Sequence, residues 1–378
     1  MSSSSRAPLF LAGALRRVAL GAWILATACA TTRSGTPAPG QHGAAETTKG
    51  ALRDGGAGPT GEALRRVLPP PHETGNAYAA ELAVSGPLAQ RLSAWPADLV
   101  VLYAGEHRGS LQTCGCPKRP RGSLARLATW NDAVSQRDPS VRTHAGYFLE
   151  DAVGFDGVER ADVSLGNRYM AQGLALGAWD ALNVGFVDLP GLAHLDPALR
   201  DALPLVSANV TGPGVRPYVI VERGGRNVGI TGITRPGVTL SEPAGYRIAE
   251  PVAAAGPVLH ELAGKVDVIV LLSYQAETWA QRLAQAHPEV DVVVDANLHR
   301  DAFPPATVGH AAWVRASYET MRAGELRLDL DARNAVVGAR DRKIDLDPDM
   351  PDRPDLAALQ REARAAMDVE QQRIFGGP

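Results

Sequence analysis

Short runs of apolar residues recur along the chain from residue 98, separated by turns and by stretches with helical spacing. Continuous runs of aliphatic and β-branched residues are typical of strands buried on both faces. The runs that predict strands are 99–103, 203–208, 218–221, 228–233, 266–272 and 290–294. The stretches that predict helices are 123–137, 166–182, 251–264 and 277–287. Alternation of strand and helix predicts a layered α/β domain.

Weaker patterns flank this region. Residues 78–95 have a helical pattern that predicts a helix leading into the domain, and 325–330 alternate with period 2, as in a strand with one solvent-facing side. Apolar residues at helical spacing over 352–373 predict a terminal amphipathic helix. The pair Gly224-Gly225 predicts a hairpin turn. We therefore expect a domain over 75–335 and, over 336–378, a C-terminal tail that contains the amphipathic helix.

The N-terminal residues have the pattern of an export signal. Arg16 and Arg17 precede an uncharged run over 18–28, which is shorter than the roughly 20 residues that span a bilayer. The sequence Leu-Ala-Thr-Ala before Cys29 resembles a bacterial lipobox, and the alternative is ordinary cleavage after Ala28. We expect a signal peptide over 1–28, lipidation of Cys29, and a flexible tether over 29–74. The lipid would make the membrane a partner and place the protein in the cell envelope, at the outer membrane or the periplasmic face.

The charge balance restricts the class of partner. The chain has 38 Lys and Arg against 41 Asp and Glu, a formal net charge of −3, so we expect no nucleic-acid partner. Of its 378 residues, 45% are hydrophobic but only 5% aromatic, which predicts a core of small aliphatic side chains.

Seven motifs in order resemble the calcineurin-like metallophosphoesterases, in particular the exported bacterial 5′-nucleotidase branch. They are Leu102–Gly109 with His107, Gly122–Arg126, Ser207–Val210, Val228–Gly232, Val266–Tyr274, Val290–His299 and, more loosely, Ser317–Leu328. The resemblance covers about residues 98–331. It implies a four-layer α/β/β/α sandwich with the site at the strand ends.

The same resemblance implies a centre of two divalent metals, and most ligand positions have changed. The family positions fall on Gly105, His107, Gly146-Tyr147, Phe186, Val187, Tyr274, Asn297 and His299. Only His107 and His299 keep an imidazole, so we expect no standard dinuclear centre. Asp188 lies near a lost position and would complete a site for one Mn, Fe or Zn ion with the two histidines. Catalytic candidates in such a site are His107, Glu106 and His144, and the alternative is that these are ordinary loop residues.

Cys114 and Cys116 form a C-x-C motif, which the chain shares with a subgroup of nucleotidase-like proteins that it resembles. Nearby cations favour the thiolate. The alternatives are a disulfide staple within the loop, a redox or metal-binding thiol pair, and a bond to a redox protein partner. Basic residues at Lys118, Arg119, Arg121 and Arg126 could bind a small anionic ligand, or could lie in a solvated loop.

Two main functions remain open on the sequence. The first is an exported lipoprotein with a degenerate metallophosphoesterase-like domain that binds a ligand or exchanges thiols without hydrolysis. The alternative is an active, metal-dependent hydrolase of phosphoesters or of sulfur-containing analogues, with a rearranged site. A third is a cell-envelope scaffold. A hydrolase would lose activity to a chelator, whereas a thiol protein would respond to a reductant.

Overall fold

The computed structural model describes residues 77–376, apart from 114–117, 155, 241–242 and 298–305. These residues all belong to one unit of the chain, Gly61–Pro378. The predicted signal peptide, Cys29, tether, Cys114, Cys116 and His299 therefore lie outside the described residues. No helix in the described ranges is long and apolar enough to cross a bilayer.

The first sheet gathers strands from both ends of the domain. Its order is β1 (Ala77–Val84), β15 (Val336–Asp345), β14 (Arg322–Leu330), β2 (Leu99–Ala104), β3 (Ser140–His144), β4 (Ala181–Asn183) and β5 (Leu205–Val206). Strands β2 to β5 run parallel, whereas β14 is antiparallel to both of its neighbours. The parallel strands therefore end at one edge, where ligand sites of open α/β sheets form.

The second sheet has the order β12 (Ala306–Val308), β13 (Ala311–Arg315), β11 (Val292–Ala296), β10 (Val268–Tyr274), β8 (Arg226–Thr234) and β7 (Tyr218–Arg223). Its four central strands are parallel. Gly224 and Gly225 have φ of 57° and 76° in the β7–β8 connection, as the predicted hairpin turn requires. A small pair of strands, β6 (Val210–Thr211) and β9 (Arg247–Ile248), stands apart from both sheets.

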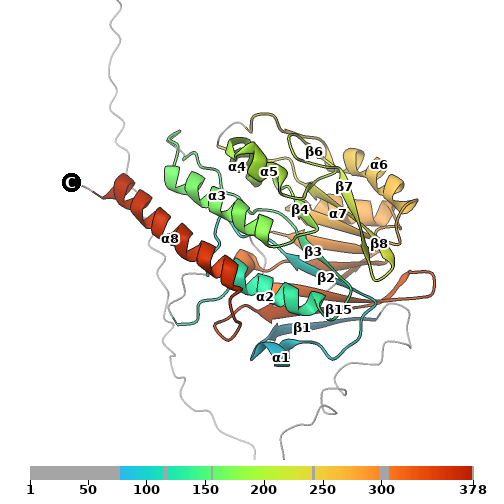
Figure 1. Cartoon of the computed structure of the whole chain (residues 1–378). Helices are drawn as coiled ribbons and strands as arrows, with labels where there is room; N and C mark the ends of the chain where they lie inside the picture. Colours follow the sequence, from blue (N-terminus) through green and yellow to red (C-terminus); the bar gives the residue numbers. More distant parts are fainter. Residues whose placement is uncertain (1–76, 114–117, 155, 241–242, 298–305, 377–378) are drawn as a thin grey trace, which may run out of the picture. The chain divides into compact units, whose positions relative to one another are not determined.

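Three hydrophobic layers join these elements into a four-layer sandwich (Figure 1). Helices α2 (Leu124–Ser135), α3 (Ala161–Leu176) and α8 (Pro354–Phe375) pack on the outer face of the first sheet. Helices α6 (Pro251–Ala263) and α7 (Glu277–Ala286) cover the second. Between the sheets, Leu99 and Val101 contact a core that includes Val268 and Val292, while Val100 and Leu102 face the helices. The shorter helical segments are α1 (Leu88–Arg91), η2 (Phe186–Asp188), α4 (Leu189–His194), α5 (Pro197–Asp201) and η3 (Tyr318–Thr320). The predicted α/β/β/α fold is confirmed.

The predicted helix over 78–95 is wrong in most of its length. Residues 77–84 form β1, which pairs in parallel with β15, and only Leu88–Arg91 is helical. Backbone pairing with a strand more than 250 residues away outweighs the weak local helical pattern, because propensity is easily overridden by tertiary contacts.

The expected tail over 336–378 differs in its first part. Strand β15 lies between β1 and β14, so these residues complete the first sheet. The amphipathic helix lies where it was expected and packs against α3 and α2 through Leu356 and Ala363.

Strand β14 also differs from expectation, since its polar side is buried. Glu325 and Arg327 are both nearly inaccessible, and they form an ion pair of 2.9 Å. Asp138 and Arg342 complete the charge balance around them. Period-2 alternation indicates which residues share a face, but not whether that face is covered.

Candidate functional site

Non-glycine residues with left-handed backbone conformations gather in the loops that follow β2, β3, β10 and β13. The residues are Glu106, Arg108, Tyr147, Gln275, Glu319 and Thr320, with φ between 46° and 65°. Such conformations cost energy for side chains with a Cβ and cluster at functional sites. The strand-end edge of the two sheets is therefore the candidate site.

Two buried histidines form a direct contact at this edge. His107 follows β2, and its Nδ1 lies 2.8 Å from Nε2 of His144, the last residue of β3. The backbone N–H of Gly146 donates to Nδ1 of His144 at 3.1 Å. Thr320 donates from Oγ1 to the carbonyl of Gly105 at 2.6 Å and lies 3.3 Å from Nδ1 of His107. The sequence thus identified two residues that the fold brings together.

Both imidazoles are held neutral near pH 7. Burial lowers the pKa of His107 to about 3, and burial together with His107 lowers the pKa of His144 well below its ordinary value. The side chain of His107 is 4% exposed, and its Nε2 has no hydrogen-bond partner among the described residues. A buried polar atom without a partner marks a position where a ligand would be stabilised.

A cleft of about 340 Å³ opens beside this pair. It is lined by His107, Arg108, Ser110, Gln112, Thr113, Glu150 and Glu319. Arg108 donates to the hydroxyl of Tyr318 at 2.7 Å and to Glu319 at 3.3 Å, and lies 3.9 Å from Glu150. Burial raises the pKa of Glu150. The cleft walls thus carry two carboxyl groups and one guanidinium.

The side chain of Tyr274 fills the space between the strand-end loops. A Cβ placed on Gly146 would lie 2.9 Å from the Cβ of Tyr274, and one placed on Gly185 would lie 2.7 Å from its ring. The rings of Tyr147 and Phe186 lie 5.9 and 6.0 Å from that of Tyr274. Burial, and then the negative charge of Glu106, raises the pKa of the Tyr274 hydroxyl. This region is therefore packed with aromatic rings.

Asp188 lies at the same edge, fully buried, and binds backbone. Its two carboxyl oxygens accept four N–H groups, from Tyr147, Phe148, Leu149 and Gly185, at 2.7 to 2.9 Å. Burial raises the pKa of Asp188 to about 7, and the four backbone hydrogen bonds oppose that shift. Asp188 therefore holds the loop after β3 against the start of η2.

Known proteins with similar sequences or structures support the assignment of the fold. No protein-family model matches the chain. A metallophosphoesterase of Bacillus subtilis, YunD, is 25% identical over 142 residues, which are 37% of this chain and 31% of that protein. The sulfate thiohydrolase SoxB of Thermus thermophilus superposes with a TM-score of 0.60 at 14% identity, over 74% of this chain and 62% of SoxB. The chain has the calcineurin-like metallophosphoesterase fold.

Two further structures give the same result. A 5′-nucleotidase precursor of Thermus thermophilus has a TM-score of 0.55 at 20% identity, over 74% of this chain and 59% of its own. The calcineurin-like phosphoesterase YfkN of Bacillus subtilis has a TM-score of 0.55 at 16% identity, over 72% of this chain and 98% of its own. The chain thus spans about a third of the curated relative and about 60% of SoxB and of the nucleotidase precursor. The resemblance to the metallophosphoesterase superfamily found in the motifs is confirmed.

Metallophosphoesterases generally use divalent metals, and the described residues do not fit such a centre. A Cβ on Gly105 would lie 3.0 Å from the Cβ atoms of both Ala296 and Ala316, so no carboxylate fits there without a shift. Tyr274 stands where the resemblance of the motifs implies a histidine, and its side chain closes the space at Gly146. In the ranges that the structure describes, no group of three or more His, Cys, Asp or Glu side chains could hold a metal. The assignments of His107, His299 and Asp188 as ligands stay predictions.

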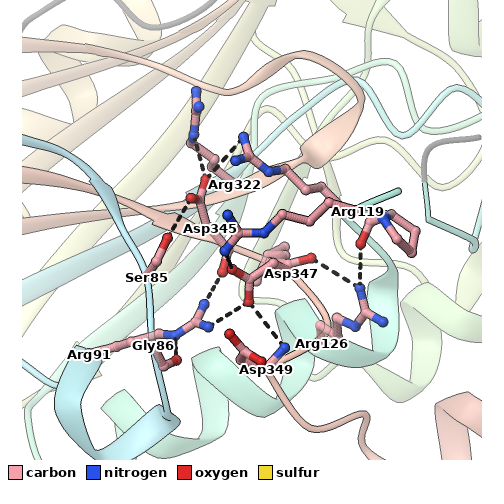
Figure 2. A network of polar contacts seen from close by, with 12 residues as sticks. Ser85, Gly86, Arg91, Arg119, Arg126, Arg322, Asp345, Asp347 and Asp349 are labelled. Carbon is pink, nitrogen blue, oxygen red and sulfur yellow. Dashed lines mark hydrogen bonds and ion pairs between the residues drawn. The ribbon is translucent and has the colours of Figure 1, made fainter. Parts of the chain in front are cut away.

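The residues proposed for anion binding are largely paired. Figure 2 shows Arg119 beside Asp347, and Arg121 lies 3.5 Å from Asp345. Arg126 lies 3.4 Å from Asp352 and donates to the carbonyl of Pro120 at 3.0 Å. Lys118 is exposed. Three of these four cations therefore contact carboxylates or carbonyls of the chain itself. Binding of a small anionic ligand by this loop stays a prediction.

Sequence reasoning missed Arg108, Glu150 and Thr320 as site residues. Arg108 lies inside a family motif, next to His107, but a single arginine in a loop carries little signal. Thr320 contacts His107 from a left-handed backbone conformation, and Glu150 lines the cleft from the loop after β3, and no local pattern indicates either position. Tyr274 was visible as a departure from the family histidine, but its ring packing against two glycines was not.

Proposed function

We propose that the domain is a non-hydrolytic metallophosphoesterase-fold protein that binds a small molecule in the cleft beside His107. We also propose that the chain is exported and held at the cell envelope by lipid on Cys29, as its N-terminal pattern predicts. The whole chain would then present a binding site at a membrane surface, beyond a flexible tether.

The observation that carries the proposal is the position of Tyr274. Two-metal phosphoesterases need carboxylates and imidazoles that converge from several loops on ions about 4 Å apart. In this chain the side chain of Tyr274 occupies the space beside Gly146 and Gly185, so these two strand-end loops leave no room there for longer ligating side chains. A separate cleft beside His107 remains open and is lined by polar residues. A binding role uses this cleft without any metal-activated water.

Metal-dependent hydrolysis is the second candidate, because YunD is named a metallophosphoesterase and several similar structures are named nucleotidases. Hydrolysis of a sulfur-containing analogue has similar support from the likeness to the sulfate thiohydrolase SoxB. Such an enzyme would have to draw ligands from Cys114, Cys116 or His299, which lie outside the described residues. A further candidate is a thiol-redox role for Cys114 and Cys116, with a redox protein as the partner.

Metal content and hydrolysis together test the proposal. The mature chain, purified without chelator, is analysed for Mn, Fe and Zn, and is assayed with p-nitrophenyl phosphate and AMP in the presence of each metal. We expect well under one ion per chain and no turnover above a matched blank. One or two ions per chain, with turnover that a chelator removes and the metal restores, would establish the hydrolase instead. Lipidation is tested separately, by incorporation of labelled fatty acid into the wild type but not into C29S.

A further inference from the structure

We propose that His144 fixes His107 as the tautomer with its proton on Nε2, so that the cleft receives a hydrogen-bond acceptor atom of the ligand where relatives would bind a metal ion. The proposal rests on the proposed function, because it concerns the same cleft, and it specifies the chemistry of what binds there. His144 is in this sense a positioning residue, and His107 is the residue that touches the ligand.

The backbone amide of Gly146 determines the tautomer of His144. The hydrogen of Gly146 N–H has a fixed direction in the peptide plane, and it points to Nδ1 of His144 at 3.1 Å between the heavy atoms. Nδ1 of His144 must therefore be the acceptor. In a neutral imidazole one ring nitrogen accepts and the other donates, so the proton of His144 lies on Nε2.

The tautomer of His144 in turn determines the tautomer of His107. Nε2–H of His144 lies 2.8 Å from Nδ1 of His107, which must then accept. The proton of His107 consequently lies on Nε2, the ring nitrogen that has no hydrogen-bond partner among the described residues. An N–H donor is thus buried at the wall of the cleft, and a ligand with an acceptor atom would satisfy it.

The opposite arrangement satisfies fewer groups. A proton on Nδ1 of His107 could point to Thr320 Oγ1, 3.3 Å away, and to Nε2 of His144. His144 would then carry its proton on Nδ1, directly facing the N–H of Gly146, and both donors would lose their acceptor. The Thr320 hydroxyl donates to the carbonyl of Gly105, so its oxygen could still accept from Nδ1 of His107. One acceptor at 3.3 Å does not offset two donors left without an acceptor.

A metal ion needs the reverse tautomer. A ligating imidazole offers a lone pair to the metal and donates its other N–H to a carboxylate, a carbonyl or water. Here the other nitrogen of His107 faces an N–H group, so Nε2 offers a hydrogen and no lone pair. His144 and Gly146 thus disfavour a metal ion at Nε2 of His107, in addition to the effect of the lost carboxylates.

The charges around the donor define the ligand further. Glu150 and Glu319 outnumber Arg108 on the cleft wall, and Arg108 is already in contact with both. A free anion would meet this excess of negative charge without an unpaired cation. The ligand class is therefore a neutral or cationic small molecule that presents an acceptor atom to His107.

Nuclear magnetic resonance on the mature chain, labelled with ¹⁵N only in histidine, tests the tautomer directly. We expect His107 to show a protonated Nε2 and a bare Nδ1, and a through-hydrogen-bond coupling between that Nδ1 and the protonated Nε2 of His144. Added Zn²⁺ should leave the His107 signals unchanged. A bare Nε2 on His107, fast exchange between tautomers, or displacement of the Nε2 proton by Zn²⁺ would each overturn the inference.

Three variants separate hydrogen bonding from packing. H144F keeps a ring but removes the donor. It should abolish the coupling and let His107 populate both tautomers. W179F is the matched packing control, because the ring of Trp179 packs nearly perpendicular to that of His144, with the ring centroids 5.6 Å apart, and takes no part in the hydrogen bond between the histidines. T320V should also leave the tautomer unchanged. If H144F fails to fold, the wild-type coupling alone still decides the proposal.

The two proposals can fail separately. Hydrolysis of AMP by a chain whose His107 keeps its Nε2 proton would refute the non-hydrolytic function and leave the tautomer assignment standing. A bare Nε2 in a chain without turnover or bound metal would refute the assignment and leave the function standing.

Discussion

Single residues decide what the strand-end site can hold. Tyr274 is fully buried, and its ring takes the space that side chains at residues 146 and 185 would otherwise occupy. The small residues and the large ring are complementary, so neither can be interpreted alone. A substitution that removes the Tyr274 ring should therefore leave a cavity and lower the free energy of unfolding.

We expect Y274A to lower the free energy of unfolding by about 3 to 5 kcal/mol, as for removal of a buried aromatic ring. Y274F should cost roughly 1 kcal/mol, because it loses only the hydroxyl that accepts from Gln275 Nε2 at 3.0 Å. Denaturant unfolding of both variants measures the difference. Equal effects of the two substitutions would show that the ring is not the filling element.

The neutral histidine pair makes stability depend on pH. The pKa of His107 is about 3 in the folded chain against 6.5 for an ordinary histidine, so between these values only the unfolded chain takes up the proton. Stability from this group is therefore lost as the pH falls below about 6.5, by up to about 1.4 kcal/mol per pH unit. The destabilisation of H107Q relative to wild type should shrink by about 2 kcal/mol between pH 7 and pH 5.

Urea unfolding at several pH values checks this expectation. Buried carboxyl groups with raised pKa, such as Asp291, contribute with the opposite sign, but they are common to both proteins and cancel in the difference. H287Q is the control, because His287 is more exposed and its Nδ1 lies 3.0 Å from Glu289. A difference that does not change with pH would mean that His107 takes up its proton at the same pH in the folded and the unfolded chain.

At the same residue scale, the sequence located His107 and His144 but not their relation. Both were candidates because they lie near positions of a known motif. Their direct contact depends on the parallel pairing of β2 with β3, which brings Ala104 opposite His144. No local pattern encodes that register. The hydrogen bond between the two histidines, and the tautomer of His107 that it fixes, could therefore be derived only from the fold.

Among the elements, the connection from β15 to α8 carries a buried network of charges. Figure 2 shows Asp345 and Asp347 surrounded by guanidinium groups from α1, from the loop before α2 and from β14. Arg91 is fully buried and donates to Asp347 at 2.6 Å, and Arg322 donates to Asp345 at 2.9 Å. Ser85 also donates to Asp345, at 2.7 Å. The network thereby joins segments that are more than 200 residues apart.

We expect D347N to destabilise the domain by about 3 to 5 kcal/mol, because it leaves the buried guanidinium of Arg91 without its charge partner. D349N is the matched control, since Asp349 is exposed two residues further along the chain and should change stability by less than about 0.5 kcal/mol. Thermal or urea unfolding of the two variants gives the comparison. A D347N protein as stable as D349N would show that Arg91 finds another partner.

The elements also show what apolar patterns can and cannot predict. Strands β2, β10 and β11 were evident because they are apolar on both faces. Strand β3, with the sequence Ser-Val-Arg-Thr-His, was missed because its polar side chains are buried through hydrogen bonds such as Thr143 to the carbonyl of Leu102. Burial of this kind leaves no hydrophobic signal.

At the scale of the whole molecule, the order of motifs predicted the four-layer architecture correctly. The topology of the first sheet could not be predicted in full, since its edge is built from the two ends of the domain, β1 and β15. Pairing between segments so distant in sequence is specified by the completed sheet, and not by either segment alone.

The edge position of β1 has a mechanical consequence. Its residues Ala77–Val84 pair in parallel with β15, with Ala77 opposite Gly338 and Val84 opposite Ile344. A force applied at Ala77 along the strand axis would load all hydrogen bonds of this ladder together, in shear. A force applied across the sheet would instead open them one after another. Under tension from a surface, the domain would therefore resist a pull on its first strand far better when the pull runs along the strand.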